Sequence, residues 1–252
     1  MLELIQITND PAFAARCEAL GGFRVFVDLE RLGKAERQAG RNTFISEHRL
    51  QDVAAVRRVL RTARLMVRVN PLHEGSAAEV DAVLAQGADL LMLPMFETAD
   101  QLQRFARLVD GRCGIVPLVE TVGALRSLPD WIDTPGLWEV YVGLNDLHIA
   151  MGLRFMFEPL AMGLVDEAAA AVRARGLRFG FGGIARVDEG LLPGRAVLGE
   201  HQRLGSGSVI LSRTFHRDDT DAVFEAQVQA LREAERSLAR RTCDGVAEDA
   251  RR

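Results

Sequence analysis

The strongest constraint on this chain is a regular alternation of short apolar runs, rich in β-branched residues, with longer segments of helical periodicity. Such alternation predicts βαβ units and a parallel sheet. The expected strands cover residues 2–8, 23–29, 65–71, 90–96, 113–120, 138–146, 178–185 and 208–215. The expected helices cover residues 10–22, 46–63, 76–88, 98–111, 121–132, 158–176, 192–205 and 218–241. Eight such units in 252 residues match the size of a (β/α)₈ TIM barrel.

A doubly wound sheet is the alternative arrangement of the same elements. Its glycine-rich dinucleotide fingerprint follows the first strand. Here "NDPAFA" follows that strand without a glycine, and "GFGGIA" comes only after the seventh strand. We therefore predict a single-domain barrel over residues 1–240, followed by a polar, disordered tail over residues 241–252.

Composition excludes several classes of protein. The net charge is −4, from 31 basic and 35 acidic side chains, whereas nucleic-acid binders usually carry a basic excess. No apolar run reaches the roughly 18 residues that span a membrane, and the N-terminus has no signal-peptide pattern. Three scattered cysteines without metal-site spacing fit a reducing compartment. We expect a cytoplasmic enzyme that acts on small molecules, with neither nucleic acid nor membrane as a partner.

Polar side chains stand at or just after the ends of most expected strands. They are Asp28, Glu30, Arg68, Asn70, Glu120, Asn145, Asp146, Arg186 and Arg213. In a (β/α)₈ barrel the active site lies at the carboxyl ends of the strands. These side chains are therefore expected to converge on one rim.

Glu120 and Asp146 end two neighbouring expected strands, with Asp28 and Glu30 across the mouth. Such an oxygen-rich site suits Mg²⁺, and Mn²⁺ or Co²⁺ could fill a similar ligand shell. Each of the two acids also has a structural explanation: Glu120 as an acid favoured by the dipole at a helix start, and Asp146 as an N-cap or turn acid.

Arg68 interrupts the apolar strand "LMVRVNP". A buried charge requires a partner. Arg68 either binds a substrate carboxylate or enolate in the mouth, or forms a rim salt bridge with Asp28 or Glu30.

Five stretches occur in order with strand-and-helix spacing: "VFVDLE", "VRVNP", "GADLLMLPMFETADQL", "VPLVET" and "VGLNDLHIAMG". This ordered set resembles the HpcH/HpaI aldolase and citrate-lyase β-subunit family, from about residue 20 to about residue 215. The resemblance implies a (β/α)₈ barrel with Mg²⁺ or Mn²⁺ on Glu120 and Asp146, and Arg68 on the substrate's carboxylate or enolate oxygen. It also implies reversible C–C bond cleavage, with pyruvate or an acyl-CoA enolate as one half, and a trimer or hexamer.

The chain departs from both branches of that family. The aldolase branch has a histidine close after the second strand's acid, where this chain has leucine and arginine. Arg31 stands where the lyase branch has a further acid, and Met95 where it has a lysine. The polar segment 31–48 fits neither branch, so we expect it to cover the mouth and select the substrate. Its candidate side chains are Lys34, Arg37, Gln38, Arg41, Asn42, Ser46 and His48.

The function these residues favour is a class II aldolase that joins or cleaves a 2-keto acid and an aldehyde. His48 is the candidate base because its ordinary pKa is near neutral; a surface position, with water as the base, is its alternative. Glycine-rich turns near strands seven and eight would suit a phosphorylated or sugar-derived aldehyde.

Two other functions stay open. An acyl-CoA lyase of the citramalyl or malyl type would use Arg37, Arg41 and Arg186 for the CoA phosphates. A barrel without catalysis would use the mouth for binding alone. The apolar stripe of the last expected helix could pack on its own barrel or on a second subunit, so a homo-oligomer is expected.

Overall fold

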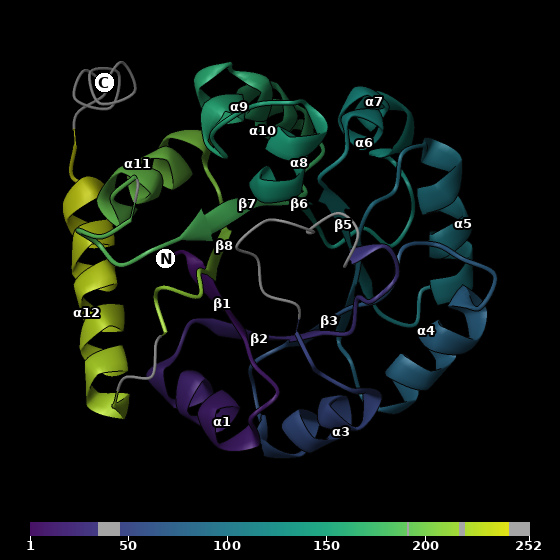
Figure 1. The fold of residues 1–252 in the computed structure, drawn as a ribbon, viewed down its shortest axis with the longest axis horizontal. Helices are drawn as coiled ribbons and strands as arrows, with labels where there is room; N and C mark the ends of the chain where they lie inside the picture. The colour runs from purple at the N-terminus through teal and green to yellow at the C-terminus, as the bar shows by residue number, and fades with distance from the viewer. Residues whose placement is uncertain (35–45, 191, 217–219, 242–252) are drawn as a thin grey trace.

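The computed structural model describes residues 1–34, 46–190, 192–216 and 220–241. Its strands are all parallel, each pairs with the next in sequence, and β8 closes the barrel onto β1 (Figure 1). The strands are β1 (Glu3–Ile7), β2 (Phe23–Asp28), β3 (Leu65–Arg68), β4 (Leu90–Leu93), β5 (Gly114–Val119), β6 (Glu139–Val142), β7 (Arg178–Ile184) and β8 (Ser208–Leu211). The predicted (β/α)₈ TIM barrel is confirmed.

Helices surround the barrel (Figure 1). They are α1 (Pro11–Leu20), α3 (Leu50–Val59), α4 (Ser76–Ala85), α5 (Ala99–Val109), α6 (Val122–Arg126), α7 (Leu128–Trp131), α8 (Leu144–Ala150), α9 (Glu158–Ala161), α10 (Leu164–Ala174), α11 (Gly194–Leu204) and α12 (Asp221–Leu238). Local signals explain several helix starts. Asp10 caps α1 by accepting the Ala12 N–H at 2.8 Å, and Thr98 forms a capping box with Gln101 at α5. None of the described helices is both long and apolar enough to cross a membrane.

Side chains alternate between the two faces of each strand, so the sequence fills two cores. The barrel interior holds one cluster, comprising Ile5, Phe26, Met66, Leu90, Met92, Val116, Leu118 and Tyr141. The outward faces pack against the helices and form the larger clusters. The interior is therefore a packed core, and a ligand has access only at an end of the barrel.

A buried charge network closes the amino-terminal end of the barrel. Arg24 is 0% exposed and forms ion pairs with Glu139, also 0% exposed, and with Glu3. The Ser208 hydroxyl donates to Glu139 at 2.7 Å. These residues begin strands or lie next to a strand's first residue, so their charges satisfy one another at the floor, away from the mouth.

The region after β6 differs from the sequence-based expectation. Asn145 and Asp146 were expected to end the sixth strand, but β6 ends at Val142 and both residues lie in the first turn of α8. Gly143 separates strand from helix, and its N–H donates to the Val119 carbonyl at 2.9 Å. Arg213 likewise lies two residues beyond the end of β8.

The floor network generates a prediction about stability. Arg24→Met should lower the free energy of unfolding by about 3 kcal/mol or more, because it leaves Glu139 buried without its cation. Urea denaturation measures the change. Arg112→Met is the matched control, since Arg112 pairs with Asp81 on the surface and its loss should cost at most about 1 kcal/mol. Equal losses in the two variants would contradict a structural role for the buried network.

Candidate functional site

Asp28 and Arg68 are the last residues of β2 and β3, and the strand register places them side by side at the mouth. The Arg68 guanidinium binds the Asp28 carboxylate at two points. Its Nε donates to Oδ1 at 2.9 Å and its terminal nitrogen donates to Oδ2 at 2.8 Å. A bidentate pair of this kind fixes the plane of the guanidinium as well as its charge.

The Asp28 carboxylate also receives donors from the following segment. Lys34 Nζ lies 2.6 Å and Ser46 Oγ 3.2 Å from Oδ2, and the Glu30 N–H donates to Oδ1 at 3.2 Å. Burial would raise the pKa of Asp28, but the Arg68 guanidinium and the Lys34 ammonium outweigh it and hold the pKa well below its usual range. Asp28 is therefore ionised, and both of its carboxylate oxygens accept hydrogen bonds that orient the neighbouring side chains.

Glu30 lies between the two cations of this cluster. One of its carboxylate oxygens is 3.4 Å from Arg68 and 3.4 Å from Lys34, and the side chain is buried. Burial of Arg68 would lower its pKa, but Asp28, Glu30 and Glu120 more than offset this and raise it. Arg68 is therefore a permanent cation whose orientation is fixed from the β2 side.

Glu120 follows β5 on another side of the mouth and is 2% exposed. One oxygen accepts the Met95 N–H at 3.2 Å, and Met95 adopts a left-handed backbone with φ of 55°. A Cβ at Gly143 would lie 3.0 Å from both the Cβ and the other carboxylate oxygen of Glu120. The absence of a side chain at Gly143 therefore gives the carboxylate its place beside the start of α8.

Asp146 is half-buried in the first turn of α8, three residues after Gly143. Within the described residues, no three His, Cys, Asp or Glu side chains are grouped closely enough to hold a metal ion together. Mg²⁺ is commonly bound by one or two carboxylates, with waters and substrate oxygens completing its shell. A donor pair of Glu120 and Asp146 fits that chemistry.

Two further predicted site residues, Asn70 and Arg186, hold neighbouring segments of the rim in place. Asn70 Oδ1 accepts the N–H groups of Arg31 and Leu32 at 2.8 and 2.9 Å, and its amide donates to Glu79 at 2.7 Å. It therefore shapes the turn after β2. Arg186 is buried and donates twice to the Phe215 carbonyl at 3.1 Å, which ties the segment after β7 to the one after β8.

The remaining predicted residues lie in α8, beyond β8 or outside the described part of the chain. Asn145 is half-buried beside Asp146 in α8, and Arg213 is exposed beyond β8. Arg37, together with Gln38, Arg41 and Asn42 of the same segment, lies outside the described residues.

His48 lies at the rim and contacts the backbone of β2. Its Nδ1 accepts the Asp28 N–H at 3.1 Å, so the neutral ring carries its proton on Nε2. Burial lowers the pKa of His48, against the attraction of Asp28 and Asp52. Nδ1, the nitrogen that could accept a proton, thus already accepts a backbone hydrogen bond. The role of His48 as a base stays a prediction.

Lys34 and Ser46 were named as loop residues but not as site residues, and both belong to the Asp28 cluster. Lys34 is buried, which is unusual for a lysine and depends on the two carboxylates that surround it. The only sequence signal was a lysine six residues after a strand-end aspartate.

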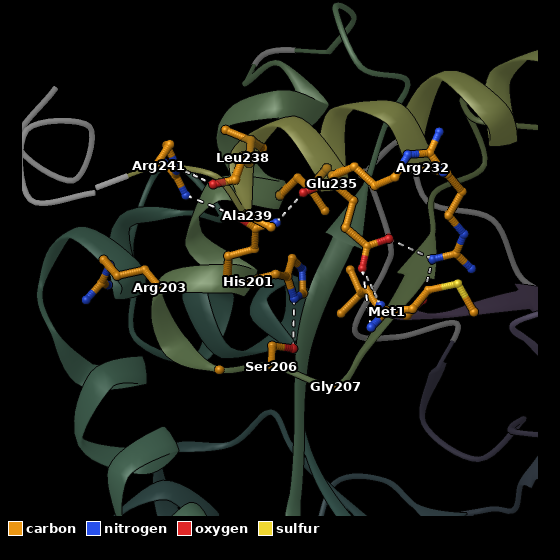
Figure 2. Close-up of a pocket in the computed structure, with 15 residues that line it drawn as sticks. Met1, His201, Arg203, Ser206, Gly207, Arg232, Glu235, Leu238, Ala239 and Arg241 are labelled. Carbon is orange, nitrogen blue, oxygen red and sulfur yellow. Dashed lines mark hydrogen bonds and ion pairs between the residues drawn. The ribbon is translucent and has the colours of Figure 1, made fainter. Parts of the chain in front are cut away.

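A groove of about 1000 Å³ lies at the opposite end of the barrel (Figure 2). It is bounded by the ends of α11 and α12 and by residues that precede β1 and β8. Two of its arginines form ion pairs within the chain: Arg203 pairs with Asp166 and Glu200, and Arg232 pairs with Glu235. The groove is remote from the strand ends that carry Asp28 and Arg68, so we do not assign the active site to it.

The Asp28 cluster predicts a specific pH dependence. Because the pKa of Asp28 is lower in the folded chain than the unfolded value of about 3.9, its ionised form stabilises the fold above that pH, and the stabilisation is lost as pH falls toward the folded pKa. Asp28→Asn should cost about 3 kcal/mol of unfolding free energy at pH 7. The gap between variant and wild type should shrink steadily below about pH 4.

Urea denaturation from pH 7 to pH 2.5 measures this gap. Asp81→Asn is the control, since Asp81 pairs with Arg112 on the surface, and the change should be small at every pH. A gap for Asp28→Asn that stays constant down to pH 2.5 would show that ionisation of Asp28 does not stabilise the fold.

Solved structures with this architecture share low sequence identity with the chain. An HpcH/HpaI aldolase from Desulfitobacterium hafniense has a TM-score of 0.65 at 14% identity, covering 96% of this chain and 94% of its own. A citrate lyase β subunit from M. tuberculosis, complexed with oxaloacetate and magnesium, has a TM-score of 0.65 at 19% identity, covering 93% and 97%. The citrate synthase SbnG has a TM-score of 0.62 at 16% identity, covering 93% and 92%. At these identities the likeness concerns the fold.

No curated protein matches the chain by sequence. The family profile described as HpcH/HpaI aldolase/citrate lyase matches residues 6–179, which run from the end of β1 to the start of β7 and include Asp28, Arg68, Glu120 and Asp146. This match covers most of the chain and agrees with the resemblance found in the sequence motifs. The chain therefore belongs to the HpcH/HpaI aldolase/citrate lyase family.

Proposed function

We propose that this protein is a metal-dependent carbon–carbon lyase that cleaves and forms the aldol product of a 2-keto acid and an aldehyde. Its family is one of aldolases and citrate lyases. The observation that carries the proposal is the fixed, fully charged Arg68, which shares the barrel mouth with Glu120 and Asp146. The substrate half that becomes the nucleophile is a pyruvate-type enolate.

Glu120 and Asp146 are the residues proposed to hold the metal, with Mg²⁺ favoured over Mn²⁺ or Co²⁺. When bound, such an ion acts as a Lewis acid on the substrate's keto oxygen. Magnesium occurs with oxaloacetate in the M. tuberculosis relative, which supports an ion and a keto acid at the same kind of site. The Met95 N–H keeps one Glu120 oxygen in place by a hydrogen bond.

Arg68 is proposed to stabilise the negative charge that develops when the keto acid loses a proton. Its Nε and one terminal nitrogen donate hydrogen bonds to Asp28. Its other terminal nitrogen lies 3.4 Å from a Glu30 carboxylate oxygen, which is a longer contact. That third donor is the one able to reach a substrate oxygen while the guanidinium keeps its orientation. A preorganised donor costs no reorganisation during the reaction.

The proton acceptor is proposed to be His48, which would first release the Asp28 N–H from Nδ1. Asparagine at position 48 offers an oxygen to the same N–H but is not a base. If a His48→Asn variant abstracted the substrate proton at the wild-type rate, the role of His48 would be limited to its hydrogen bond with the rim backbone. Asn70, Asn145, Arg186, Arg213 and Arg37 are proposed to contribute to substrate binding around the mouth.

Acyl-CoA cleavage is the second candidate reaction. A citrate lyase β subunit is among the structural neighbours, and Glu30 lies 3.4 Å from Arg68 in the mouth. Formation of acetyl-CoA, with glyoxylate from malyl-CoA or pyruvate from citramalyl-CoA, would identify this reaction, and its absence favours the aldolase. A barrel that only binds ligands would show neither reaction.

A homo-oligomer, trimeric or hexameric, is proposed for the protein in the cytoplasm. Helix α12 packs on α11 of the same barrel and buries Phe224, Val228 and Leu231, so its apolar stripe is largely used within the chain. The support for assembly is therefore the family resemblance, and light scattering at micromolar concentration tests it. A stable monomer would refute it.

The metal assignment predicts that removing the charge of either carboxylate weakens metal binding. Glu120→Gln and Asp146→Asn should each weaken Mn²⁺ binding by about tenfold or more, since each removes a charged ligand worth at least 1.4 kcal/mol. Mn²⁺ electron paramagnetic resonance measures the affinity. Asp100→Asn on α5 is the control, since Asp100 is exposed and its substitution should leave the affinity unchanged. Wild-type affinity in both mouth variants would place the ion elsewhere.

The reaction predicts hydrogen exchange at the methyl group of pyruvate in D₂O. The wild type with Mg²⁺ should catalyse this exchange without any aldehyde, because enolate formation precedes the aldol step. Arg68→Ala should lower the exchange rate by about 10²–10³, the typical cost of losing one preorganised donor. Arg68→Lys should recover little, since lysine lacks the planar fork that Asp28 grips.

Proton NMR of the methyl signal follows the exchange. Mn²⁺ affinity should stay near wild type in Arg68→Ala, which separates loss of the donor from loss of the ion. No exchange by the wild type, together with formation of acetyl-CoA from malyl- or citramalyl-CoA, would move the assignment to the lyase reaction.

A further inference from the structure

The one tyrosine of the chain, Tyr141, belongs to the packed core inside the barrel. It is 1% exposed. Its hydroxyl accepts the Ile210 N–H of β8 at 2.8 Å. The same hydroxyl lies 2.6 Å from the Gly182 carbonyl and 3.0 Å from the Phe181 carbonyl of β7, to which it donates its proton. A side chain of β6 thus bonds to the backbone of both following strands.

These bonds fall on an irregularity in the sheet. Gly180 pairs with Ser208 and Gly183 pairs with Ile210, so three steps along β7 match two along β8. The extra residue is a β-bulge, which removes regular ladder partners from nearby backbone groups. The Tyr141 hydroxyl supplies hydrogen bonds to an N–H of β8 and to carbonyls of the bulged strand at this irregularity.

Two glycines of β7 make this arrangement possible. A Cβ at Gly180 would lie 2.6 Å from a ring carbon of Tyr141, so only glycine leaves room for the ring. Gly182 has φ of 56°, a left-handed conformation that glycine adopts without strain. In the sequence "GFGG", the first glycine therefore leaves room for the tyrosine ring and the second allows the backbone conformation of the bulge.

The bulge in turn contacts the start of α8. A Cβ at Gly182 would lie 3.0 Å from Leu144 Cδ1, and Leu144 is the buried first residue of α8. On its other side, the turn is tied to β5 by the Gly143 N–H, which donates to Val119 next to Glu120. The first turn of α8 is thus seated between β5 and the β7 bulge.

We propose that Tyr141 is a positioning residue of the mouth: its buried hydroxyl holds the β7 bulge, and the bulge fixes the first turn of α8, which carries Asn145 and Asp146. Tyr141 touches no substrate in this role. It acts through Gly182 and Leu144 on the carboxylate of Asp146. The effect of Tyr141 on metal binding rests on the proposed function, whereas its effect on the backbone of α8 does not.

Hydrogen–deuterium exchange of single amides, followed by NMR on the full chain, tests the backbone part. Tyr141→Phe removes only the hydroxyl. It should speed exchange at least about tenfold at the Ile210 amide and at the Leu147 amide, the latter being bonded to the Gly143 carbonyl in the first turn of α8. The Val56 amide in α3 should keep its wild-type rate, which shows that the barrel remains folded.

Ser208→Ala is the matched control. It removes another buried hydroxyl of the barrel interior, on β8 at the floor, where Ser208 donates to Glu139. It should leave exchange at Leu147 unchanged. Gly182→Ala perturbs the β7 bulge in a second way, because an added Cβ strains the backbone there while Tyr141 stays intact. It should also speed exchange at Leu147.

Mn²⁺ affinity supplies the functional readout. Tyr141→Phe and Gly182→Ala should each weaken binding about tenfold, and Ser208→Ala should not. Unchanged exchange at Leu147 in Tyr141→Phe would overturn the proposal, even if Ile210 exchanged faster, since the link from bulge to helix would be missing. If the wild type bound no Mn²⁺, the proposed metal function would fail, and the exchange rates would still decide the role of Tyr141.

Discussion

The mouth of this barrel depends on a single carboxylate, that of Asp28. A guanidinium at the end of a buried strand is unfavourable unless a charged acceptor lies within reach, and the register of β2 with β3 places Asp28 beside Arg68. The same carboxylate receives Lys34 and Ser46, which flank residues 35–45 on both sides. One buried acid therefore orients the cation proposed to meet the substrate and anchors both described ends of the polar segment.

This arrangement divides the mouth into two sides of different chemistry. Around β2 and β3, two cations and two acids satisfy one another. Around β5, β6 and β7, the proposed metal ligands Glu120 and Asp146 lie next to glycines, which leave room for a ligand and for close backbone contacts. A keto acid placed between the two sides would meet a metal on one face and a fixed guanidinium on the other, which is the charge distribution that an enolate requires.

The fold was predictable because strand and helix alternation is a local property of the sequence, repeated with little interruption. The residues of the rim were predictable for the same reason, since strand ends fall where apolar runs stop. The two roles considered for Arg68, salt bridge and substrate contact, prove compatible in geometry: Asp28 holds two of its nitrogens and leaves the third for the second role.

What sequence reasoning missed depends on contacts between distant segments. The burial of Lys34 requires Asp28 and Glu30 in their folded positions, and nothing in the local sequence encodes it. Helix α8 was taken as the end of a strand because it is short and follows an apolar run. The bulge in β7 depends on a hydroxyl from β6, so the glycines of "GFGG" could be noticed but their purpose could not.

The most direct test of this account is a crystal structure of the protein with Mn²⁺ and oxalate, an analogue of the pyruvate enolate. The anomalous signal of manganese locates the ion without assumption. The account predicts the peak within ligand distance of Glu120 and Asp146, with one oxalate oxygen on Arg68 and the guanidinium still bidentate on Asp28. A peak on Asp28 or Glu30, or an Arg68 side chain that has left Asp28 to reach the ligand, would contradict it.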